Sequence, residues 1–318
     1  MRNKKYLAAF AVLAISIGLA GCTSQSEVAA LTVAVHDSVV ITPAQLAEFK
    51  KESGIDVTLV KAGDAGALTN KLILTKDQPI ADAFYGIDNT FLGAATDAGI
   101  VSDYQAIDFG DVCFNYDKTW FTNHEQAAPE SIDDLLKPEY KGLTVIENPS
   151  TSSTGLAFLT ATVGKFGDTG WQKYWQGLKA NDVRIDAGWE DAYTIDFSGS
   201  SGKGNFPIVL SYSSSPADEA NTVSIDNSCF RQTEYAGLLK GGANTDGAKK
   251  FVDFLLKDSF QSSIPGSMYM YPVSKTAALP EAWTAKAPAA TNLVAVESAV
   301  INTERTSWLK AWDAIFRN

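Results

Sequence analysis

The chain has 318 residues, of which 45% are hydrophobic and 20% charged, with 7 Trp, 11 Tyr and 16 Phe. This apolar content is enough for a large buried core, which excludes disorder or low-complexity repeats as the main description. The 26 Lys and Arg residues face 37 Asp and Glu residues, a formal charge of −11, so nucleic acid is not an expected partner. A chain of this length predicts two domains or one unit of two lobes.

Residues 1–22 have the features of a secretory signal. Three basic residues among the first five precede an apolar run at 7–19, and small residues lead to Cys22. The pattern predicts that Cys22 is lipidated and anchors the chain to the outer face of a bacterial membrane. An uncleaved membrane helix is the alternative. No second apolar stretch approaches the roughly 20 residues of a membrane span, and residues 23–30 are expected to form a polar tether.

Removal of the signal would change the formal charge from −11 to −14, because it carries three of the basic residues and no acidic ones. This charge favours a cationic or neutral ligand. Two cysteines, Cys113 and Cys229, then remain in an oxidising compartment, and we expect them to form a disulfide. Two buried free thiols are the alternative. The bridge would close a loop of about 115 residues and contribute up to ~4–5 kcal/mol to stability in the chain-entropy model.

Strands and helices alternate along the first third of the chain. Residues 31–35 are predicted to form a strand, and Thr42 with Gln45 a capping box, with Pro43 at the first helical position and Gly54 at the helix end. A strand near 55–59, a helix near 66–76, a strand near 81–86 and a helix from about 89 to 99 follow. This order predicts a parallel sheet with both faces covered.

A second unit of the same kind follows. Its predicted elements are strands near 143–146, 183–185 and 208–211 and helices near 154–166 and 169–179. Two α/β sheets joined by crossing segments around Cys113 and Cys229 would hinge about those segments, and the disulfide would staple the hinge. The last predicted helix, 303–316, is expected to pack on the outside of a lobe. The expected division is one lobe at 31–112 and 229–318, including the C-terminal helices, and a second lobe at 113–228.

Sequence signals for catalysis are weak. The only histidines are His36 and His124, so a multi-histidine metal site is excluded, and neither an HExxH nor a GxSxG motif occurs. The run 199–204 departs from the P-loop pattern. Glu190 and Asp191 are adjacent and would point in different directions on a helix. We therefore expect no enzyme, no metal and no cofactor.

Several loops at predicted carboxyl ends of strands carry polar and aromatic residues, and ligands of open α/β sheets bind at these ends. Trp189, Tyr212 and Tyr269 suit stacking on a planar or cationic ring, although each singly could be a core residue. Asp64 and Asp88 suit an amino group or a positive charge, with turn capping as the alternative.

Hydroxyl-rich helix starts and a histidine add to this set. The runs 150–155 and 213–216 suit an oxygen-rich or anionic group, with ordinary helix capping as the alternative. His36 fits a structural role as well as a ligand contact. The combination of aromatic, acidic and hydroxyl side chains predicts a cleft for a small aromatic cation.

Seven segments, in this order, carry a family resemblance: LTVAVHDS, VKAGDAGALTNKL, ADAFYGIDNTFL, ENPSTSSTGLAF, GWEDAY, VLSYSSSPA and FQSSIPGSMYMYPV. On these segments the chain resembles the thiamine-binding proteins of bacterial ABC importers. They belong to the periplasmic binding protein class, which also contains ferric-iron and polyamine receptors. The resemblance implies a bilobal α/β fold of the type II class, with two parallel-rich mixed sheets joined by a hinge.

The resemblance also implies a monomeric receptor that closes on thiamine or its phosphates and delivers it to a membrane permease. The ligand positions that it implies are Asp64, Ala65, Ser152, Ser153, Trp189, Tyr212, Ser213, Ser214 and Ser215. The chain has His36 where the family commonly has Tyr, Tyr269 where it commonly has Trp, and Asp218 where an aromatic residue often occurs. A receptor for another organic cation, such as a polyamine, is the main alternative. A ferric-iron receptor is less favoured, because Ser213 follows Tyr212 where such receptors have two adjacent tyrosines.

Overall fold

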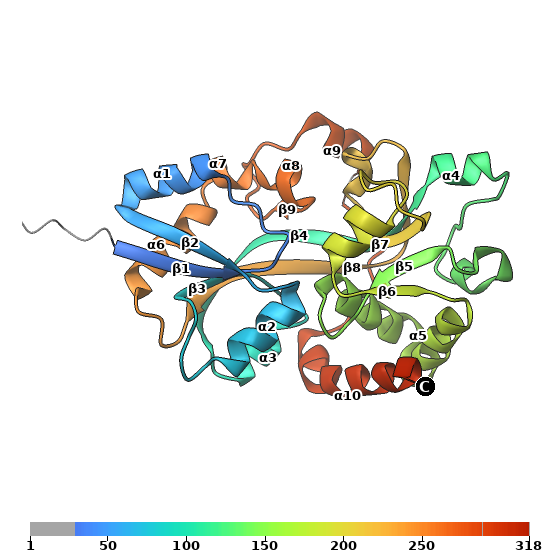
Figure 1. Cartoon of the computed structure of the whole chain (residues 1–318), viewed down its shortest axis with the longest axis horizontal. Helices are drawn as coiled ribbons and strands as arrows, with labels where there is room; N and C mark the ends of the chain where they lie inside the picture. Colours follow the sequence, from blue (N-terminus) through green and yellow to red (C-terminus); the bar gives the residue numbers. More distant parts are fainter. Residues whose placement is uncertain (1–28, 288, 318) are drawn as a thin grey trace, which may run out of the picture.

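Two long strands run through the middle of the molecule and connect its two sides (Figure 1). They are β4 (Val101–Asp117) and β8 (Thr222–Leu239), which pair antiparallel. The computed structural model describes residues 29–287 and 289–317, so the predicted signal and Cys22 lie outside the described residues. In the described part, nine strands form one sheet in the order β2-β1-β3-β8-β4-β7-β5-β6, with β9 beside β4.

One side of the molecule, here called the β1 side, repeats a strand-helix pattern. Its elements are β1 (Ala29–Val35), α1 (Pro43–Ser53), β2 (Ile55–Lys61), α2 (Ala65–Leu74), β3 (Ala83–Asp88), α3 (Leu92–Asp97) and α6 (Thr245–Leu255). β1 pairs parallel with β2 and β3, as predicted, and it begins two residues inside the expected tether. Thr42 and Gln45 form the capping box, with Pro43 in the first turn. Gly54 ends α1 in the left-handed region, with φ at 74°, so both predicted ends of this helix are confirmed.

The other side, here called the β5 side, contains a second parallel group. Its elements are α4 (Lys118–Asn123), η1 (Asp134–Leu136), η2 (Pro138–Tyr140), β5 (Thr144–Glu147), α5 (Ser153–Ala180), β6 (Arg184–Asp186), the π-helix η3 (Glu190–Asp196), β7 (Ile208–Tyr212) and η4 (Ser215–Ala217). β5 pairs parallel with β6 and β7, and β7 pairs antiparallel with β4. The two helices predicted at 154–166 and 169–179 form α5, which is interrupted at Gly167, where φ is 70° and ψ −177°.

The C-terminal part adds short elements and one long helix. These are α7 (Asp258–Gln261), α8 (Ile264–Met268), β9 (Tyr271–Pro272), α9 (Glu281–Lys286) and α10 (Ser298–Arg317). The prediction grouped the C-terminal helices with residues 31–112, and α10 does contact α3 of the β1 side. α10 packs mainly on α5 of the β5 side (Figure 1), where the Trp312 and Trp175 rings are 5.8 Å apart. An aromatic helix face does not specify which lobe covers it.

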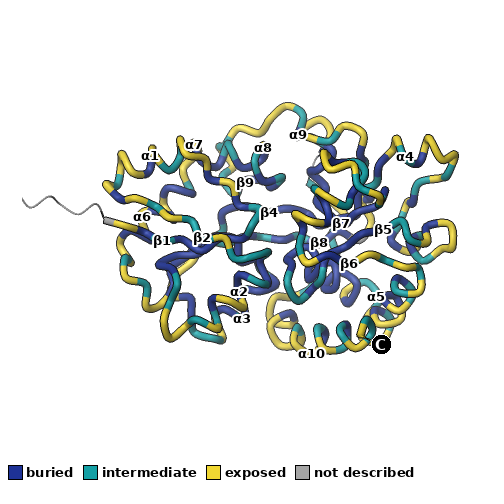
Figure 2. Tube along the Cα trace, in the orientation of Figure 1, coloured by how far each residue is buried: buried dark blue, intermediate teal, exposed yellow. Residues whose placement is uncertain are grey.

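Burial follows the sheet. The strands are mostly buried, and the outer faces of α1 and α10 are exposed (Figure 2). Because β4 and β8 pair with strands of both sides, the two parallel groups that we expected as separate sheets are joined by continuous hydrogen bonding. None of the helices in residues 29–287 and 289–317 has both the length and the apolarity needed to cross a membrane.

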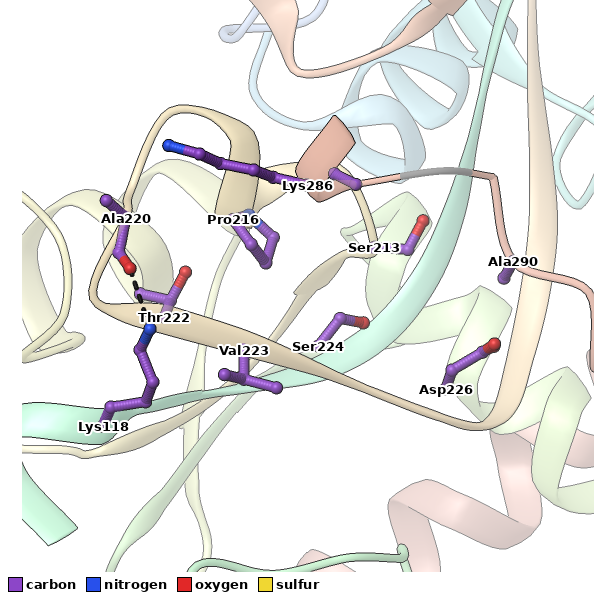
Figure 3. A pocket seen from close by; sticks show the side chains of 11 residues that line it. Lys118, Ser213, Pro216, Ala220, Thr222, Val223, Ser224, Asp226, Lys286 and Ala290 are labelled. Atoms are coloured by element: carbon purple, nitrogen blue, oxygen red, sulfur yellow. Dashed lines mark hydrogen bonds between the residues drawn. The ribbon is translucent and has the colours of Figure 1, made fainter. Parts of the chain in front are cut away.

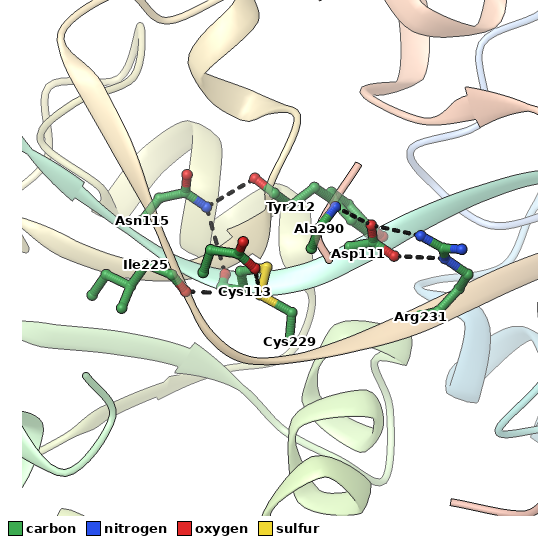
Figure 4. Close-up of a disulfide and its surroundings, with 9 residues drawn as sticks. Asp111, Cys113, Asn115, Tyr212, Ile225, Cys229, Arg231 and Ala290 are labelled. Atoms are coloured by element: carbon green, nitrogen blue, oxygen red, sulfur yellow. Dashed lines mark hydrogen bonds and ion pairs between the residues drawn. A yellow bond between two sulfur atoms is a disulfide. The ribbon is translucent and has the colours of Figure 1, made fainter. Parts of the chain in front are cut away.

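The crossing strands are tied together covalently and by charge (Figure 4). Cys113 of β4 and Cys229 of β8 form the disulfide that the sequence predicted, with the Cα atoms 4.6 Å apart. Beside it, the Arg231 guanidinium donates to both carboxylate oxygens of Asp111, at 2.8 and 3.0 Å. The Ala290 N–H donates to the same carboxylate at 2.7 Å. These contacts fix the two strands at the point where they pass from one side to the other.

Candidate ligand-binding site

A small cavity lies where the β1 side meets the β5 side. Its walls are His36, Ser38, Asp64, Ser153, Trp189, Tyr212, Glu234, Met268 and Met270. Most of these residues stand at predicted carboxyl ends of strands: His36 directly follows β1, and Tyr212 is the last residue of β7. The cavity has a volume of about 10 Å³, room for about one water molecule. The two sides are therefore closed on each other, and a larger ligand can enter only when they separate.

Asp64 joins the two sides. It is the N-cap of α2, and its carboxylate accepts a hydrogen bond from Ala65 N–H at 2.6 Å. From the β5 side, the Ser152 hydroxyl donates to the carboxylate at 2.8 Å and the Trp189 N–H at 2.9 Å. The Ser153 N–H and hydroxyl contact it more weakly, at 3.4 and 3.5 Å. Within the described part of the chain Asp64 forms no ion pair. His36, on the opposite wall of the cavity, interacts with this carboxylate through its charge but forms no ion pair with it, so a cation bound beside Asp64 could pair with it directly.

An ion pair forms the floor of the cavity. His36 Nε2 lies 3.1 Å from Glu234 Oε2, and both side chains are buried. Burial lowers the pKa of His36, but the charge and hydrogen bond of Glu234 outweigh it and raise this pKa to about 9. Glu234 also accepts from the Gln232 amide at 2.9 Å, and Gln232 accepts from the Tyr212 hydroxyl at 3.2 Å. His36 is therefore a protonated, fixed group at neutral pH.

Sequence reasoning did not single out Glu234. Gln232 and Glu234 alternate on one face of β8 among buried Phe230, Ala236 and Leu238. Two polar residues in the middle of an otherwise apolar strand face could have indicated a buried polar site, because buried polar groups require hydrogen-bond partners. The partner, His36, is 198 residues away in sequence.

Aromatic rings cover the cavity on the β5 side. The Trp189 ring is stacked on Tyr193, with centroids 4.8 Å apart and planes at 11°. Tyr269 lies 5.6 Å and Tyr212 6.0 Å from the same indole, and the indole N–H donates to the Ser211 hydroxyl at 3.0 Å. The structure thus brings the three predicted aromatic residues together and adds Tyr193. A planar ligand that enters beside Trp189 would contact an aromatic surface that is already held in place.

The predicted hydroxyl groups divide between different places. Ser152 and Ser153 meet Asp64 at the cavity, as described above. The Ser214 hydroxyl donates to the Tyr269 carbonyl at 2.5 Å, and the Ser215 hydroxyl lies 3.0 Å from that of Ser211. Ser213 faces a separate pocket of about 470 Å³ on the β5 side, together with Lys118, Thr222 and Ser224 (Figure 3). The run 213–215 therefore offers no free hydroxyl to the cavity in this closed form.

Two further predicted residues do not line the cavity. Ala65 is buried in the first turn of α2, where its N–H contacts Asp64. Asp88 is fully buried at the end of β3 and accepts from the Thr90 N–H and hydroxyl at 2.6 and 2.5 Å. Burial outweighs these bonds and raises the pKa of Asp88 to about 7. Asp88 thus caps the turn that follows β3, which is the alternative that we gave for this residue.

Comparison with known proteins agrees with this architecture. Residues 82–292 match the family described as bacterial extracellular solute-binding protein. The thiamine-binding periplasmic protein of Salmonella typhimurium is 28% identical, over 89% of this chain and 92% of its own length. That of Brucella suis is 27% identical, over 96% and 97%. A solved periplasmic thiamin binding protein superposes with a TM-score of 0.79, covering 90% of this chain and 96% of its own at 25% identity.

The chain thus belongs to the bacterial extracellular solute-binding protein family. The predicted resemblance and the predicted α/β periplasmic-binding-protein fold are both confirmed. Proteins of this class are non-enzymatic transport components that act outside the cytoplasm and supply an ABC importer with its substrate. A cavity enclosed between two sides fits that role, because such a receptor must surround a small solute and release it.

Proposed function

We propose that this chain binds thiamine between its β1 and β5 sides and delivers it to an ABC permease. The observation that carries the proposal is Asp64, an anionic group without an ion partner in the described residues, beside the aromatic cluster of Trp189. Thiamine combines a positively charged thiazolium ring with an aminopyrimidine ring. The names of the relatives support the same ligand.

The proposed binding mode uses both sides of the molecule at once. Stacking on the Trp189 cluster would contribute roughly 0.5–2 kcal/mol per ring, and Asp64 would supply charge complementarity. Because Asp64 belongs to the β1 side and Trp189 to the β5 side, a ligand between them would favour the closed form over the open one. The first lobe would then consist of residues 31–112 and 229 onward, and the second lobe of residues 113–228. α10 follows residue 229 in sequence but packs mainly on α5 of the second lobe.

Calorimetry with the chain from Thr23 onward, which contains every described residue, tests the ligand. Thiamine, its mono- and diphosphate, spermidine and ferric citrate are titrated in parallel. We expect sub-micromolar one-to-one binding of thiamine. Absence of heat and of a thermal shift with every thiamine form would exclude the proposal. Strong binding of spermidine alone would establish the polyamine alternative, which the acidic cavity walls also favour.

Trp189→Ala separates the cavity from other places. The variant removes the ring on which the ligand would stack, so thiamine binding should be lost while the folded circular dichroism spectrum is retained. Tyr104→Ala is the matched aromatic control, because Tyr104 is exposed on β4 and does not line the cavity. Unchanged thiamine affinity in Trp189→Ala would place the site elsewhere.

Lipid anchoring at Cys22 and a monomeric state complete the proposal. Mass spectrometry of the protein extracted from membranes is expected to give an N-terminal Cys22 that carries acyl chains, and Cys22→Ser should release the protein from the membrane fraction. Light scattering of the chain from Thr23 onward should give the mass of one copy. Membrane-extracted protein whose Cys22 carries no acyl chain would contradict the anchor.

A further inference from the structure

A row of hydrogen-bonded hydroxyl groups leads from the cavity into the interior of the β5 side. The Ser152 hydroxyl, which contacts Asp64 Oδ2 at 2.8 Å, is also 3.0 Å from the Thr154 hydroxyl. The Thr154 hydroxyl in turn lies 2.6 Å from Glu147 Oε2. Ser152, Thr154 and Glu147 are fully buried. The row therefore joins Asp64, which lines the cavity, to the carboxyl group of Glu147, which does not.

The three contacts of this row fix the number of protons that it holds. Each hydrogen bond needs one proton between its two oxygens, and a hydroxyl group supplies one. The hydroxyls of Ser152 and Thr154 thus supply two of the three protons. If neither carboxyl group carried a proton, one contact would hold two oxygens together with no proton between them. The third proton therefore belongs to a carboxyl group at one end of the row, that of Asp64 or that of Glu147.

Glu147 is the end of the row that suits a neutral, protonated group. Among the described residues its Oε1 has no hydrogen-bond partner and its carboxyl group forms no ion pair, and an unpaired buried carboxylate is costly. Burial raises the pKa of Glu147 well above its ordinary value, and the charges of Asp64 and Asp186 act in the same direction. Asp64 differs, because the N–H groups of Ala65 and Trp189 donate to it at 2.6 and 2.9 Å.

We propose that Glu147 is a positioning residue, whose proton orders the Thr154 and Ser152 hydroxyls so that Ser152 donates to Asp64. The inference rests on the proposed function, in which Asp64 is the anionic partner of the ligand. With the proton on Glu147, each hydroxyl accepts from the group before it and donates to the next. Ser152 is the N-cap of α5 on the β5 side, and Asp64 is the N-cap of α2 on the β1 side. The ordered row therefore supports a hydrogen bond that holds the two sides together around a ligand.

Calorimetry with thiamine tests the row through two disruptive variants and one conservative variant. Thr154→Val replaces the middle hydroxyl by a methyl group, and Glu147→Leu removes the proton donor, so both should bind thiamine about three- to tenfold more weakly. Glu147→Gln retains an N–H donor for Thr154 and should stay within about twofold of the unmodified protein. Thermal unfolding without ligand checks that each variant is folded, and Thr154→Val carries the test if Glu147→Leu does not fold.

Thr160→Val is the matched control for Thr154→Val. Thr160 is fully buried in the same helix, and its hydroxyl has no hydrogen-bond partner among the described residues. The control removes the same group from α5 without touching the row, so its thiamine affinity should not change. An equal loss of affinity in the two valine variants would overturn the inference, because the effect would then come from the packing of α5.

Infrared spectroscopy locates the proton without a ligand. A protonated carboxyl group has a C=O stretching band that a carboxylate lacks, and the difference spectrum between the unmodified protein and Glu147→Gln at neutral pH should contain this band. Its absence would overturn the inference and leave the proposed function intact. Full thiamine affinity in Thr154→Val, or an affinity of Glu147→Gln as low as that of Glu147→Leu, would do the same. Failure of the unmodified protein to bind thiamine would remove the proposed function and this inference with it.

Discussion

At the scale of single residues, Asp64 has two roles that the same carboxylate serves at once. It caps α2 through Ala65 and accepts hydrogen bonds from Ser152 and Trp189 across the cleft. The hydrogen bonds therefore fix this carboxylate at the position where we propose that a cationic ligand binds.

Asp64→Asn separates these two roles. The amide oxygen can still accept a hydrogen bond at the N-cap, and Asn is as good an N-cap as Asp, so we expect the free energy of unfolding to change by less than about 1 kcal/mol. Thiamine affinity should fall about tenfold or more, because a hydrogen bond to a charged group is worth roughly 1.5–3 kcal/mol. Calorimetry and urea unfolding of the same preparation measure both quantities. Unchanged affinity would show that the ligand does not use this charge.

His36 gives a prediction about pH. Its pKa of about 9 exceeds the ordinary value of 6.5 because Glu234 outweighs the effect of burial, so the stabilisation is complete below pH 6.5 and is lost as the pH rises through 9. The shift corresponds to about 3 kcal/mol. NMR titration should show His36 still protonated at pH 8, with His124→Gln used to assign the two imidazole signals.

Glu234→Gln is the informative variant for this pair. It removes the charge that raises the pKa of His36 and leaves the burial that lowers it. The pKa of His36 should therefore fall to its ordinary value of 6.5 or below. If the pKa of His36 stays near 9 in this variant, the charge of another carboxylate, such as Asp64 or Asp108, keeps the imidazole protonated.

At the scale of elements, local rules predicted most of what stands around the cavity. The capping box of Thr42 and Gln45, the end of α1 at Gly54 and the break of α5 at Gly167 all depend on neighbouring residues in sequence. The strand ends that carry His36 and Tyr212 followed from the alternation of strands and helices. These features could be predicted because a cap, a turn or a parallel unit has a local signature.

The parts of the site that could not be predicted depend on distant pairing. Glu234 reaches His36 only because β8 returns to pair with β3, and neither strand carries information about the other in its own sequence. The separation of Ser213 from Ser152 is of the same kind, since it depends on how the two sides close. The resemblance to a family indicated the ligand position of Ser213, but the packing of this chain directs it into the separate pocket.

The start of α2 gives a prediction about closure. Gly66 lies against the loop before α5, and a Cβ atom there would come within 2.8 Å of the Ser150 carbonyl oxygen and 2.6 Å of the Phe91 ring. Gly66→Ala should therefore oppose closure and weaken thiamine binding about tenfold or more. The Phe91 ring is buried on the same β1 side as Gly66, so the variant should also lose some stability without ligand, although the helix propensity of Ala is better than that of Gly.

Gly266→Ala is the control for this change, because Gly266 is exposed in α8 and a Cβ atom there meets nothing within 4 Å. Calorimetry measures the affinity of both variants, and thermal unfolding without ligand measures their stability. Full affinity in Gly66→Ala would mean that the loop before α5 moves aside and that the contact does not limit closure.

At the scale of the whole molecule, β4 and β8 link the two groups of parallel strands, because β8 pairs with β3 and β4 pairs with β7. The disulfide between Cys113 and Cys229 and the ion pair between Asp111 and Arg231 lie together where these strands cross. Motion of the β1 side against the β5 side must bend the same segment. The disulfide and the ion pair at this place limit how far the two sides can separate, but they do not prevent a hinge rotation.

The disulfide between Cys113 and Cys229 is expected to stabilise the folded protein. Cys113→Ala with Cys229→Ala should lower the free energy of unfolding by about 3–5 kcal/mol, because the bridge spans 116 residues and its removal returns the entropy of a long loop to the unfolded chain. Urea unfolding of the double variant, and of the unmodified protein with a reductant, should give the same lowered midpoint. Alkylation of the unfolded, unreduced protein that lacks Cys22 should label no thiol. Labelling of both cysteines, or a midpoint that the double substitution leaves unchanged, would show that the two strands are held by their hydrogen bonds and by the Asp111–Arg231 pair alone.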